Sequence, residues 1–224
     1  MAELTEDEVA YLKVVTTIKN PIRASFVKVM KAELNDLNDQ MEYSVQCLVP
    51  KNATETIKDL QNAAKMAFKQ GVVKGFWEAG KLPGGFKNPL RDGDKAGGVA
   101  LGGLPDGTEP GDKVEYNNHY FFNCKNTKKI VVKDQKNRDI IDDETIIKSG
   151  DYVRISLVAY PYNKKSKGIA FSLRGIQLLK EGEALGGGGS AANDFGEVPM
   201  SEDMGDTGDE LDDMFSKREA NAPF

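Results

Sequence analysis

The clearest pattern of hydrophobic and polar positions lies between Gly150 and Lys180. Apolar and polar side chains alternate from Val153 to Tyr160, and the alternation resumes from Ile169 to Arg174 after a polar, basic interruption. Alternation with a period of two is typical of a strand that buries one face. Two such runs joined by a short loop predict a β-hairpin that packs on a core. Its predicted core face comprises Val153, Ile155, Leu157, Ala159, Ile169, Phe171 and Leu173.

The opposite face of this predicted hairpin places aromatic rings beside cations. Its strand positions carry Arg154, Tyr160, Tyr162 and Arg174. Its connecting loop carries Lys164, Lys165 and Lys167. In proteins that bind single-stranded nucleic acids, such rings stack on bases and such cations contact phosphates. Tyrosine is also common on ordinary solvated strand faces, so the hairpin alone leaves both interpretations open.

Other strand-like runs are spread along the chain. Val, Ile, Thr and Phe are frequent in residues 14–31, and residues 41–50 form a second run, which together predict a meander over residues 14–49. Residues 119–125 and 129–134 predict another hairpin. One face of its first strand carries Tyr120, Phe122 and Cys124, and the other face carries His119, Phe121 and Asn123. Because aromatic rings occur on both faces, the sequence does not decide which face is buried.

Residues 51–70 follow a helical period instead. We expect this helix to be capped by Asn52 and Glu55 in a capping box and to stop at Gly71. The predicted buried stripe comprises Ile57, Leu60, Ala64 and Ala67. Residues 81–118 are rich in Gly and Pro and are longer than an ordinary connection.

Strands that come as hairpins, together with few helices, predict a mainly β fold. An OB-fold antiparallel barrel with one inserted helix accommodates the pattern, and the usual ligand of that fold is single-stranded nucleic acid. A β-sandwich is the alternative. We expect a flexible N-terminus at residues 1–12, an OB-fold domain at 13–180, a Gly-rich linker at 181–193 and a disordered acidic tail at 194–224.

The charge of the chain is unevenly distributed. Residues 181–224 contain twelve acidic and two basic side chains, a net charge of −10, which leaves +5 for residues 1–180 because the total is −5. A mildly basic body joined to an acidic tail is one style of nucleic-acid-binding protein, although such a tail can also serve only for solubility. Met214 and Phe215, inside an acidic run, and the last residue, Phe224, are candidate contacts with a protein partner.

Other candidate chemistry is sparse. Cys47 and Cys124 lie in strand-like runs, which favours buried free thiols over a disulfide or a metal site. Four aspartates between residues 92 and 112 do not match the spacing of a calcium loop, and His119 has no nucleophile beside it. We therefore expect no metal and no cofactor. A metal-dependent nuclease that uses these aspartates, or a protein-interaction adaptor, are the alternatives.

The sequence has no run of about 18 apolar residues that could span a membrane. Its first twelve residues are acidic and lack the basic and apolar parts of a signal peptide. We therefore expect a cytoplasmic protein with no membrane partner.

Five segments of the body occur in an order that is similar to one family. They are RASF at 23–26, YSVQCLVPK at 43–51, HYFFNCK at 119–125, SGDYVRISLVAYPYN at 149–163 and KGIAFSLRGIQLLKEGEALGG at 167–187. In these segments the chain resembles the bacteriophage single-stranded DNA-binding proteins with one OB fold and, more distantly, the helix-destabilising proteins of podoviruses. The resemblance implies an OB fold that binds single strands without enzymatic activity, in DNA replication, recombination and repair.

These arguments give one set of predicted DNA-binding residues: Arg23, Tyr43, Lys51, Tyr120, Phe122, Arg154, Tyr160, Tyr162, Lys164, Lys165, Lys167 and Arg174. Phe171 is left out because it shares the core phase of its strand. The expected partners are single-stranded DNA and, through the tail, a replication polymerase, helicase or recombinase. A homodimer stays open. For a viral protein, the expected location is the cytoplasm of the host cell.

Overall fold

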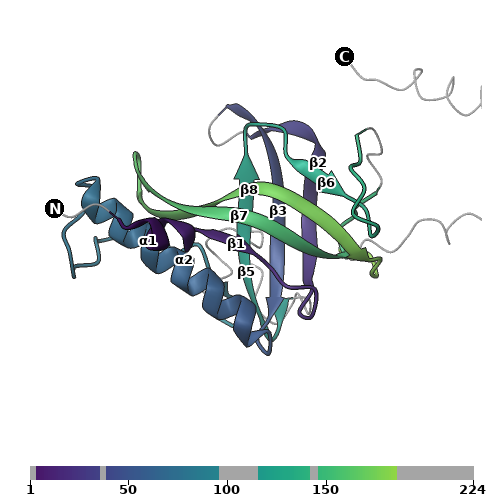
Figure 1. Ribbon diagram of the computed structural model, residues 1–224, viewed down its shortest axis with the longest axis horizontal. Coiled ribbons are helices and arrows are strands. Elements are labelled where there is room, and N and C mark those ends of the chain that lie inside the picture. The colour runs from purple at the N-terminus through teal and green to yellow at the C-terminus, as the bar shows by residue number, and fades with distance from the viewer. Residues whose placement is uncertain (1–3, 36–38, 96–115, 142–145, 186–224) are drawn as a thin grey trace, which may run out of the picture. The chain divides into compact units, whose positions relative to one another are not determined.

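The structure is a computed structural model, and it describes residues 4–35, 39–95, 116–141 and 146–185. Figure 1 shows the long β7–β8 hairpin crossing the strands β2, β3 and β5, with helix α2 packed below them. The elements are, in order, α1 (Glu6–Ala10), β1 (Lys13–Val15), β2 (Ile22–Asn35), β3 (Gln40–Pro50), α2 (Thr54–Val73), β4 (Arg91–Asp92), β5 (His119–Asn126), β6 (Val131–Lys133), β7 (Tyr152–Asn163) and β8 (Lys167–Lys180).

Five of the strands pair in a closed ring. Strand β2 pairs with β3, β3 with β5, β8 with β7, and β7 with β2, all antiparallel. The remaining pair, β5 with β8, is parallel. In chain order these strands are the five strands of an OB fold, in which the third and fifth lie side by side. The predicted mainly β OB fold with an inserted helix is therefore confirmed, and the β-sandwich is not the fold.

The core fills the inside of this ring. All seven side chains of the predicted core face of the β7–β8 hairpin are buried, at 5% exposure or less. The Phe122 and Phe171 rings meet edge to face in this core, with their centroids 5.1 Å apart. Cys47 and Cys124 are buried free thiols, as predicted. Burial and the neighbouring Cys47 raise the pKa of Cys124 well above its ordinary value, so this thiol stays protonated.

Helix α2 covers one end of the barrel through its apolar stripe. Ile57, Leu60 and Ala67 are buried as predicted, whereas Ala64 is only partly buried. The predicted capping box is wrong, because Ala53 is the N-cap residue and the helix has no side-chain cap. Gly71 does not end the helix. It lies where a Cβ atom would be 2.0 Å from the Trp77 ring, so it is needed for close packing.

Two local predictions are wrong because long-range pairing decided otherwise. Strand β1 pairs with β7 rather than with β2, so no meander runs over residues 14–49. Strands β5 and β6 do not form a hairpin, since each runs parallel to β8. Residues 4–12, predicted as part of a flexible N-terminus, include α1, which has a capping box between Thr5 and Glu8, and Leu12, which is buried in the core.

The ordered body extends past the predicted start of the linker at residue 181. Gly182 donates its N–H to Asp151 at 3.0 Å, and Leu185 donates its N–H to the Ser149 carbonyl at 3.1 Å. Gly150 has a φ of 112°, and a Cβ atom there would lie 1.9 Å from the Glu183 carbonyl oxygen. Residues 181–185 are thus fastened to the barrel. Within the described residues, no helix is long and apolar enough to cross a bilayer.

Candidate nucleic-acid interface

The register of the strands defines one continuous outward surface, here called the outer barrel face. A cross-strand row runs through Lys28, Ser44, Lys125, Ser172 and Val158, which lie on β2, β3, β5, β8 and β7. A neighbouring row joins Ser25, Gln46 and Asn123. In an OB fold, oligonucleotides bind on the outward face of the second and third strands and to the loops 1–2 and 4–5. Here these are β3 and β5, the β2–β3 connection and the β7–β8 tip.

Polar contacts hold the middle of the outer barrel face in place. Gln46 donates to the Asn123 side chain at 3.0 Å and accepts a hydrogen bond from the Tyr116 hydroxyl. Lys125 lies 3.0 Å from both carboxylate oxygens of Glu42, which is buried. One end of the face is covered by a small apolar cluster, with Leu185 packed against Leu48, Tyr116 and Phe121. The accessible part therefore lies toward Ser44, Lys28 and Lys125.

The β7–β8 tip supplies a cluster of exposed cations. Lys164, Lys165 and Lys167 are exposed, and none of them has an ion-pair partner among the residues that the structure describes. Such lysines are free to exchange counterions for phosphates. The predicted phosphate-binding loop therefore has the exposure and the charge that the role needs.

Tyr160 and Tyr162 lie on the outward phase of β7, next to this tip, and both are partly buried. Burial, followed by the negative charge of Glu42, raises the pKa of Tyr160 above its ordinary value. The Tyr160 ring therefore stays neutral at physiological pH and can stack without repelling phosphates.

The two predicted arginines of the hairpin differ in their surroundings. Arg154 donates to the side chain of Gln177, the residue opposite it on β8, at 2.7 Å. Arg174 is exposed and is the extra residue of a β-bulge, because Ser156 pairs with Gly175 and Leu157 pairs with Leu173. The bulge changes the phase of β8 beyond this point. Arg174 therefore does not share a regular row with Arg154.

Three further predicted residues are engaged by the fold itself. Arg23 donates to the carbonyls of Gly150 at 3.2 Å and Glu183 at 2.9 Å, so it fastens the segment after β8 to the barrel. Tyr43 and Tyr120 are on the inner phase of their strands and pack, partly buried, against the core. They lie at the ends of the barrel rather than on the outer barrel face.

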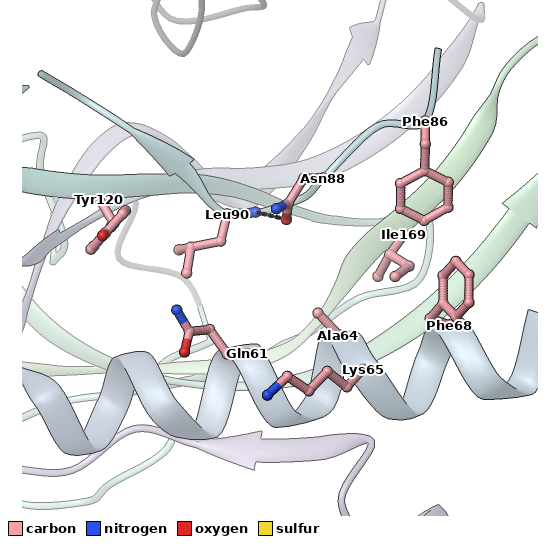
Figure 2. Close-up of a pocket in the computed structure, with 9 residues that line it drawn as sticks. All are labelled: Gln61, Ala64, Lys65, Phe68, Phe86, Asn88, Leu90, Tyr120 and Ile169. Carbon is pink, nitrogen blue, oxygen red and sulfur yellow. Dashed lines mark hydrogen bonds between the residues drawn. The ribbon is translucent and has the colours of Figure 1, made fainter. Parts of the chain in front are cut away.

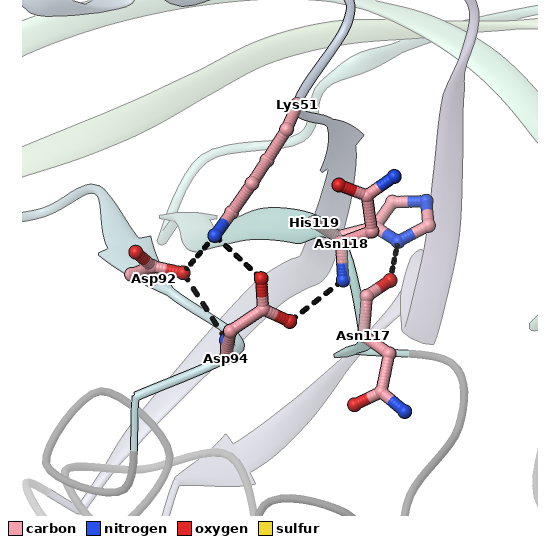
Figure 3. Close-up of polar contacts among 6 residues, drawn as sticks. All are labelled: Lys51, Asp92, Asp94, Asn117, Asn118 and His119. Atoms are coloured by element: carbon pink, nitrogen blue, oxygen red, sulfur yellow. Dashed lines mark hydrogen bonds and ion pairs between the residues drawn. The ribbon is translucent and has the colours of Figure 1, made fainter.

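Lys51 is held by two carboxylates (Figure 3). Its Nζ lies 2.6 Å from Asp92 and 2.6 Å from Asp94, and 5.2 Å from the centroid of the Tyr120 ring. The hydrogen bonds to Asp92 and Asp94 raise the pKa of Lys51, and the bond from Lys51 lowers the pKa of Asp94. Asp94 also accepts the N–H of Asn118 at 2.7 Å. This cluster fastens the start of β5 to the end of β3.

The prediction that Phe122 stacks on bases is wrong. Its side chain is fully buried, because its strand phase points into the barrel and its ring packs on Phe171. The other face of β5 is not an open aromatic face either, since Phe121 is equally buried in the small outer cluster. Arg91 lies over the Phe121 ring, with its guanidinium carbon 4.4 Å from the ring centroid.

A cleft lies on the helix side of the barrel (Figure 2). It has a volume of about 490 Å³ and is bordered by Gln61 and Lys65 of α2 and by Phe86, Leu90 and Tyr120 across from them. Of the predicted DNA-binding residues, it includes only Tyr120. The cleft is therefore separate in composition from the outer barrel face.

The sequence did not identify several residues of the outer barrel face. Lys125 and Asn123 follow a mixed aromatic run whose facing was undecided. Phe26 is 56% exposed although it lies within a strand, and nothing in the sequence pattern signals its backbone conformation. The only signal in the sequence was the polar character of Asn123 and Lys125, which alternate with apolar positions of β5.

Some predicted features fall outside the described residues. These are Asp106 and Asp112 of the aspartate-rich loop and the tail residues Met214, Phe215 and Phe224. Within the described residues, no group of three or more His, Cys, Asp or Glu side chains could hold a metal ion. Asp92 and Asp94 are instead paired with Lys51.

Three solved structures with a similar fold come from bacteriophages. The single-stranded DNA-binding protein of bacteriophage Enc34, truncated at its C-terminus, has a TM-score of 0.58 and 17% identity, covering 77% of this chain and 86% of that chain. The Enc34 protein in complex with single-stranded DNA has a TM-score of 0.56 and 18% identity, covering 78% and 88%. Gp2.5 of bacteriophage T7, a single-stranded DNA-binding protein, has a TM-score of 0.53 and 14% identity, covering 85% and 98%.

Sequence comparison extends over a similar part of the chain. Protein p50 of Acyrthosiphon pisum secondary endosymbiont phage 1 is 25% identical over 190 residues, which cover 82% of this chain and 94% of p50. The model of the family described as "Enterobacter phage Enc34, ssDNA-binding protein" matches residues 12–205. This match includes all the strands of the barrel, and the chain therefore belongs to the Enc34 single-stranded DNA-binding protein family.

Proposed function

We propose that this protein binds single-stranded DNA with little sequence preference, in phage-type DNA replication, recombination and repair. The observation that carries the proposal is the outer barrel face, where an OB-fold surface lies next to tyrosines and to three exposed lysines that have no acidic partner among the described residues. Membership of a family of single-stranded DNA-binding proteins and a similar fold solved with single-stranded DNA support it. The same facts favour a binding protein over the nuclease alternative.

Binding would combine two kinds of contact. Bases would stack on Tyr160 and Tyr162, while phosphates would contact Lys164, Lys165, Lys167 and Arg174. Neither contact depends on the identity of the base, since every base has an aromatic face and every nucleotide a phosphate. A protein with this preference melts weak hairpins without ATP, because a ligand that binds one state shifts the equilibrium toward that state.

A salt titration of binding to labelled single-stranded DNA tests the proposal. The logarithm of the association constant should fall linearly with the logarithm of salt concentration, with a slope of about −0.7 for each phosphate contacted. Oligonucleotides of different sequence should bind alike, and duplex should bind more weakly. An affinity independent of salt, or a clear preference for duplex, would contradict the proposal. Incubation with Mg²⁺ or Mn²⁺ should leave the strand uncut.

We further propose two roles for the acidic residues 186–224. With ten acidic and two basic side chains, they would compete with DNA for the cations of the barrel. When DNA is bound, Met214 and Phe215, or Phe224, would recruit a replication polymerase, helicase or recombinase. A chain of 39 residues spans roughly 30–40 Å, which is long enough to reach cations on the same or a neighbouring barrel. The host cytoplasm would be the place of action, and a homodimer is compatible with these roles.

Truncation after Leu185 tests competition, and substitution of the two phenylalanines tests recruitment. The truncation keeps the contacts of residues 181–185 with the barrel. The truncated protein should bind single strands more tightly, with an advantage that shrinks as salt rises. Phe215→Ala and Phe224→Ala should keep DNA affinity but recover less partner in pull-downs. Unchanged affinity after truncation would refute competition, and normal recovery by both variants would refute docking.

A further inference from the structure

Phe26 occupies an unusual place in strand β2. Ser25 pairs with Gln46 and Lys28 pairs with Ser44, so two residues of β2, Phe26 and Val27, lie opposite one residue of β3. This arrangement is a β-bulge. Phe26 has a φ of 47°, in the left-handed region that a non-glycine residue seldom adopts. The first position of a bulge with this backbone is normally a glycine.

The side chain at this position gives little to the fold. A large apolar ring in a left-handed conformation strains the backbone, and Phe26 is 56% exposed, so burial does not offset that strain. Val27 provides the packing of the bulge, because it lies partly buried against the core. A glycine or asparagine at position 26 would satisfy the backbone better. The presence of a phenylalanine therefore calls for a contact made by its exposed face.

The bulge lies between two residues of the outer barrel face, and Phe26 is exposed there. Along β2, Phe26 and Val27 lie between Ser25 and Lys28, whose partners Gln46 and Ser44 belong to the two cross-strand rows of that face. Beyond β3, strand β5 carries Asn123, which is exposed, and Lys125. The polar contacts of Gln46 with Asn123 and Tyr116 hold this part of the surface in place. Phe26 is thus an exposed aromatic residue on β2, between two residues of the outer barrel face.

We propose that Phe26 is a stacking platform for one unpaired base of single-stranded DNA, and that the bulge serves to present it. The assignment rests on the proposed function and adds a second stacking position, on β2, to the tyrosines of β7. A base is available to a protruding ring only when it is not stacked inside a duplex. Phe26 therefore helps to distinguish single strands from duplex.

Substitution at position 26 separates stacking from folding. Phe26→Gly removes both the ring and the strain, so its melting temperature should equal or exceed that of the wild type. Its affinity for oligo(dT) should nevertheless fall about 5- to 150-fold, the usual effect of one stacked base. The salt slope should not change, because no cation is removed. Phe26→Tyr should bind within about twofold of the wild type, and Phe26→Leu should bind as weakly as Phe26→Gly.

A fluorescent variant gives an independent measurement. Trp77 is the only tryptophan of the chain and is 8% exposed. In Phe26→Trp, oligo(dT) should quench fluorescence strongly, whereas the wild type should show little quenching. Val9→Ala, which removes a 49% exposed apolar side chain from α1, is the matched control and should bind normally.

The possible results are distinguishable. If the wild type binds single strands but Phe26→Gly and Phe26→Leu bind equally well, or Phe26→Trp is not quenched, the role of Phe26 is refuted while the proposed function stands. If the wild type does not bind single strands, both are refuted.

Discussion

Two regions of the barrel combine lysine with tyrosine, and the fold uses them differently. At the end of β3, Lys51 lies over the Tyr120 ring but is held by Asp92 and Asp94. At the β7–β8 tip, Lys164, Lys165 and Lys167 lie near tyrosines but have no acidic partner within the described part of the chain. The sequence does not distinguish the two regions, because in both of them lysine occurs in or beside a strand that carries aromatic residues.

The difference teaches that the availability of a charge is a tertiary property. Affinity for a polyanion comes largely from counterions released when a cation meets a phosphate. A lysine already paired with two carboxylates has few counterions to release and must break its pairs first. Among the described residues, the tip lysines have no ion pairs to break, and they can release their counterions when they contact phosphate. We therefore expect the tip to contribute to DNA binding and the Lys51 cluster to contribute to folding.

The largest expected effect comes from removing the tip cations. Replacing Lys164, Lys165 and Lys167 by alanine should reduce the salt slope by about 2, at about 0.7 per phosphate. The corresponding loss of affinity at 0.1 M salt is about 100-fold. Replacing Lys13, Lys19 and Lys58, which are also exposed, removes the same charge and is the matched control. Equal effects of the two triple variants would mean that only net charge matters and would undo the contrast.

Removing one ring next to the tip should have a somewhat smaller effect. Tyr160→Ala or Tyr162→Ala should cost about 1–3 kcal/mol of binding free energy, without changing the salt slope. Tyr160→Phe should bind normally, because the hydroxyl is not needed for stacking. Tyr11→Ala, at a 60% exposed tyrosine beside α1, is the control. Normal binding by both alanine variants would show that the outer barrel face is not where bases stack.

The Lys51 cluster should respond in the opposite way. Lys51→Met should lower the free energy of unfolding by about 1 kcal/mol, since it breaks two ion pairs at a partly exposed site. For a body of this size, that is a fall in melting temperature of about 2–4 °C. DNA affinity should stay within about twofold. A reduced salt slope in this variant would show that Lys51 leaves its carboxylates to contact phosphate.

The sequence predicted what depends on local pattern. The alternation from Val153 to Leu173 is enough to assign the core face of the β7–β8 hairpin, because a strand has only two faces. It was not enough for β5, where apolar side chains occupy both phases and Phe121 and Phe122 are both buried. The pairing of β1 with β7 joins residues far apart in the chain, and no local signal specifies such a partner.

The sequence predicted the kinds of residue in the candidate site better than it predicted which individual residues belong to it. Lysines in a polar loop were expected to be exposed, and those of the β7–β8 tip are exposed. The partners of Lys51 and Arg23 come from distant segments, at Asp92 and Glu183, so their engagement was invisible in the sequence. The left-handed backbone of Phe26 depends on the pairing of β2 with β3, since a bulge exists only relative to a partner strand.

The smallest effect we predict concerns the pH dependence of the Lys51 cluster. The bond from Lys51 and the N–H of Asn118 lower the pKa of Asp94 below its ordinary value of 3.8. A carboxyl group with a lowered pKa in the folded state stabilises the fold at pH values above 3.8, and this contribution is lost as the pH falls through the lowered pKa.

Asp94→Asn keeps an oxygen for the Asn118 N–H but removes the charge. The variant should therefore be less stable than the wild type at pH 7, and the difference should shrink below about pH 4. Urea unfolding at pH 7, 5, 4 and 3 measures it, with Asp59→Asn on the exposed side of α2 as the control. A difference that does not change with pH would show that the Asp94 charge has no part in holding β5 to β3.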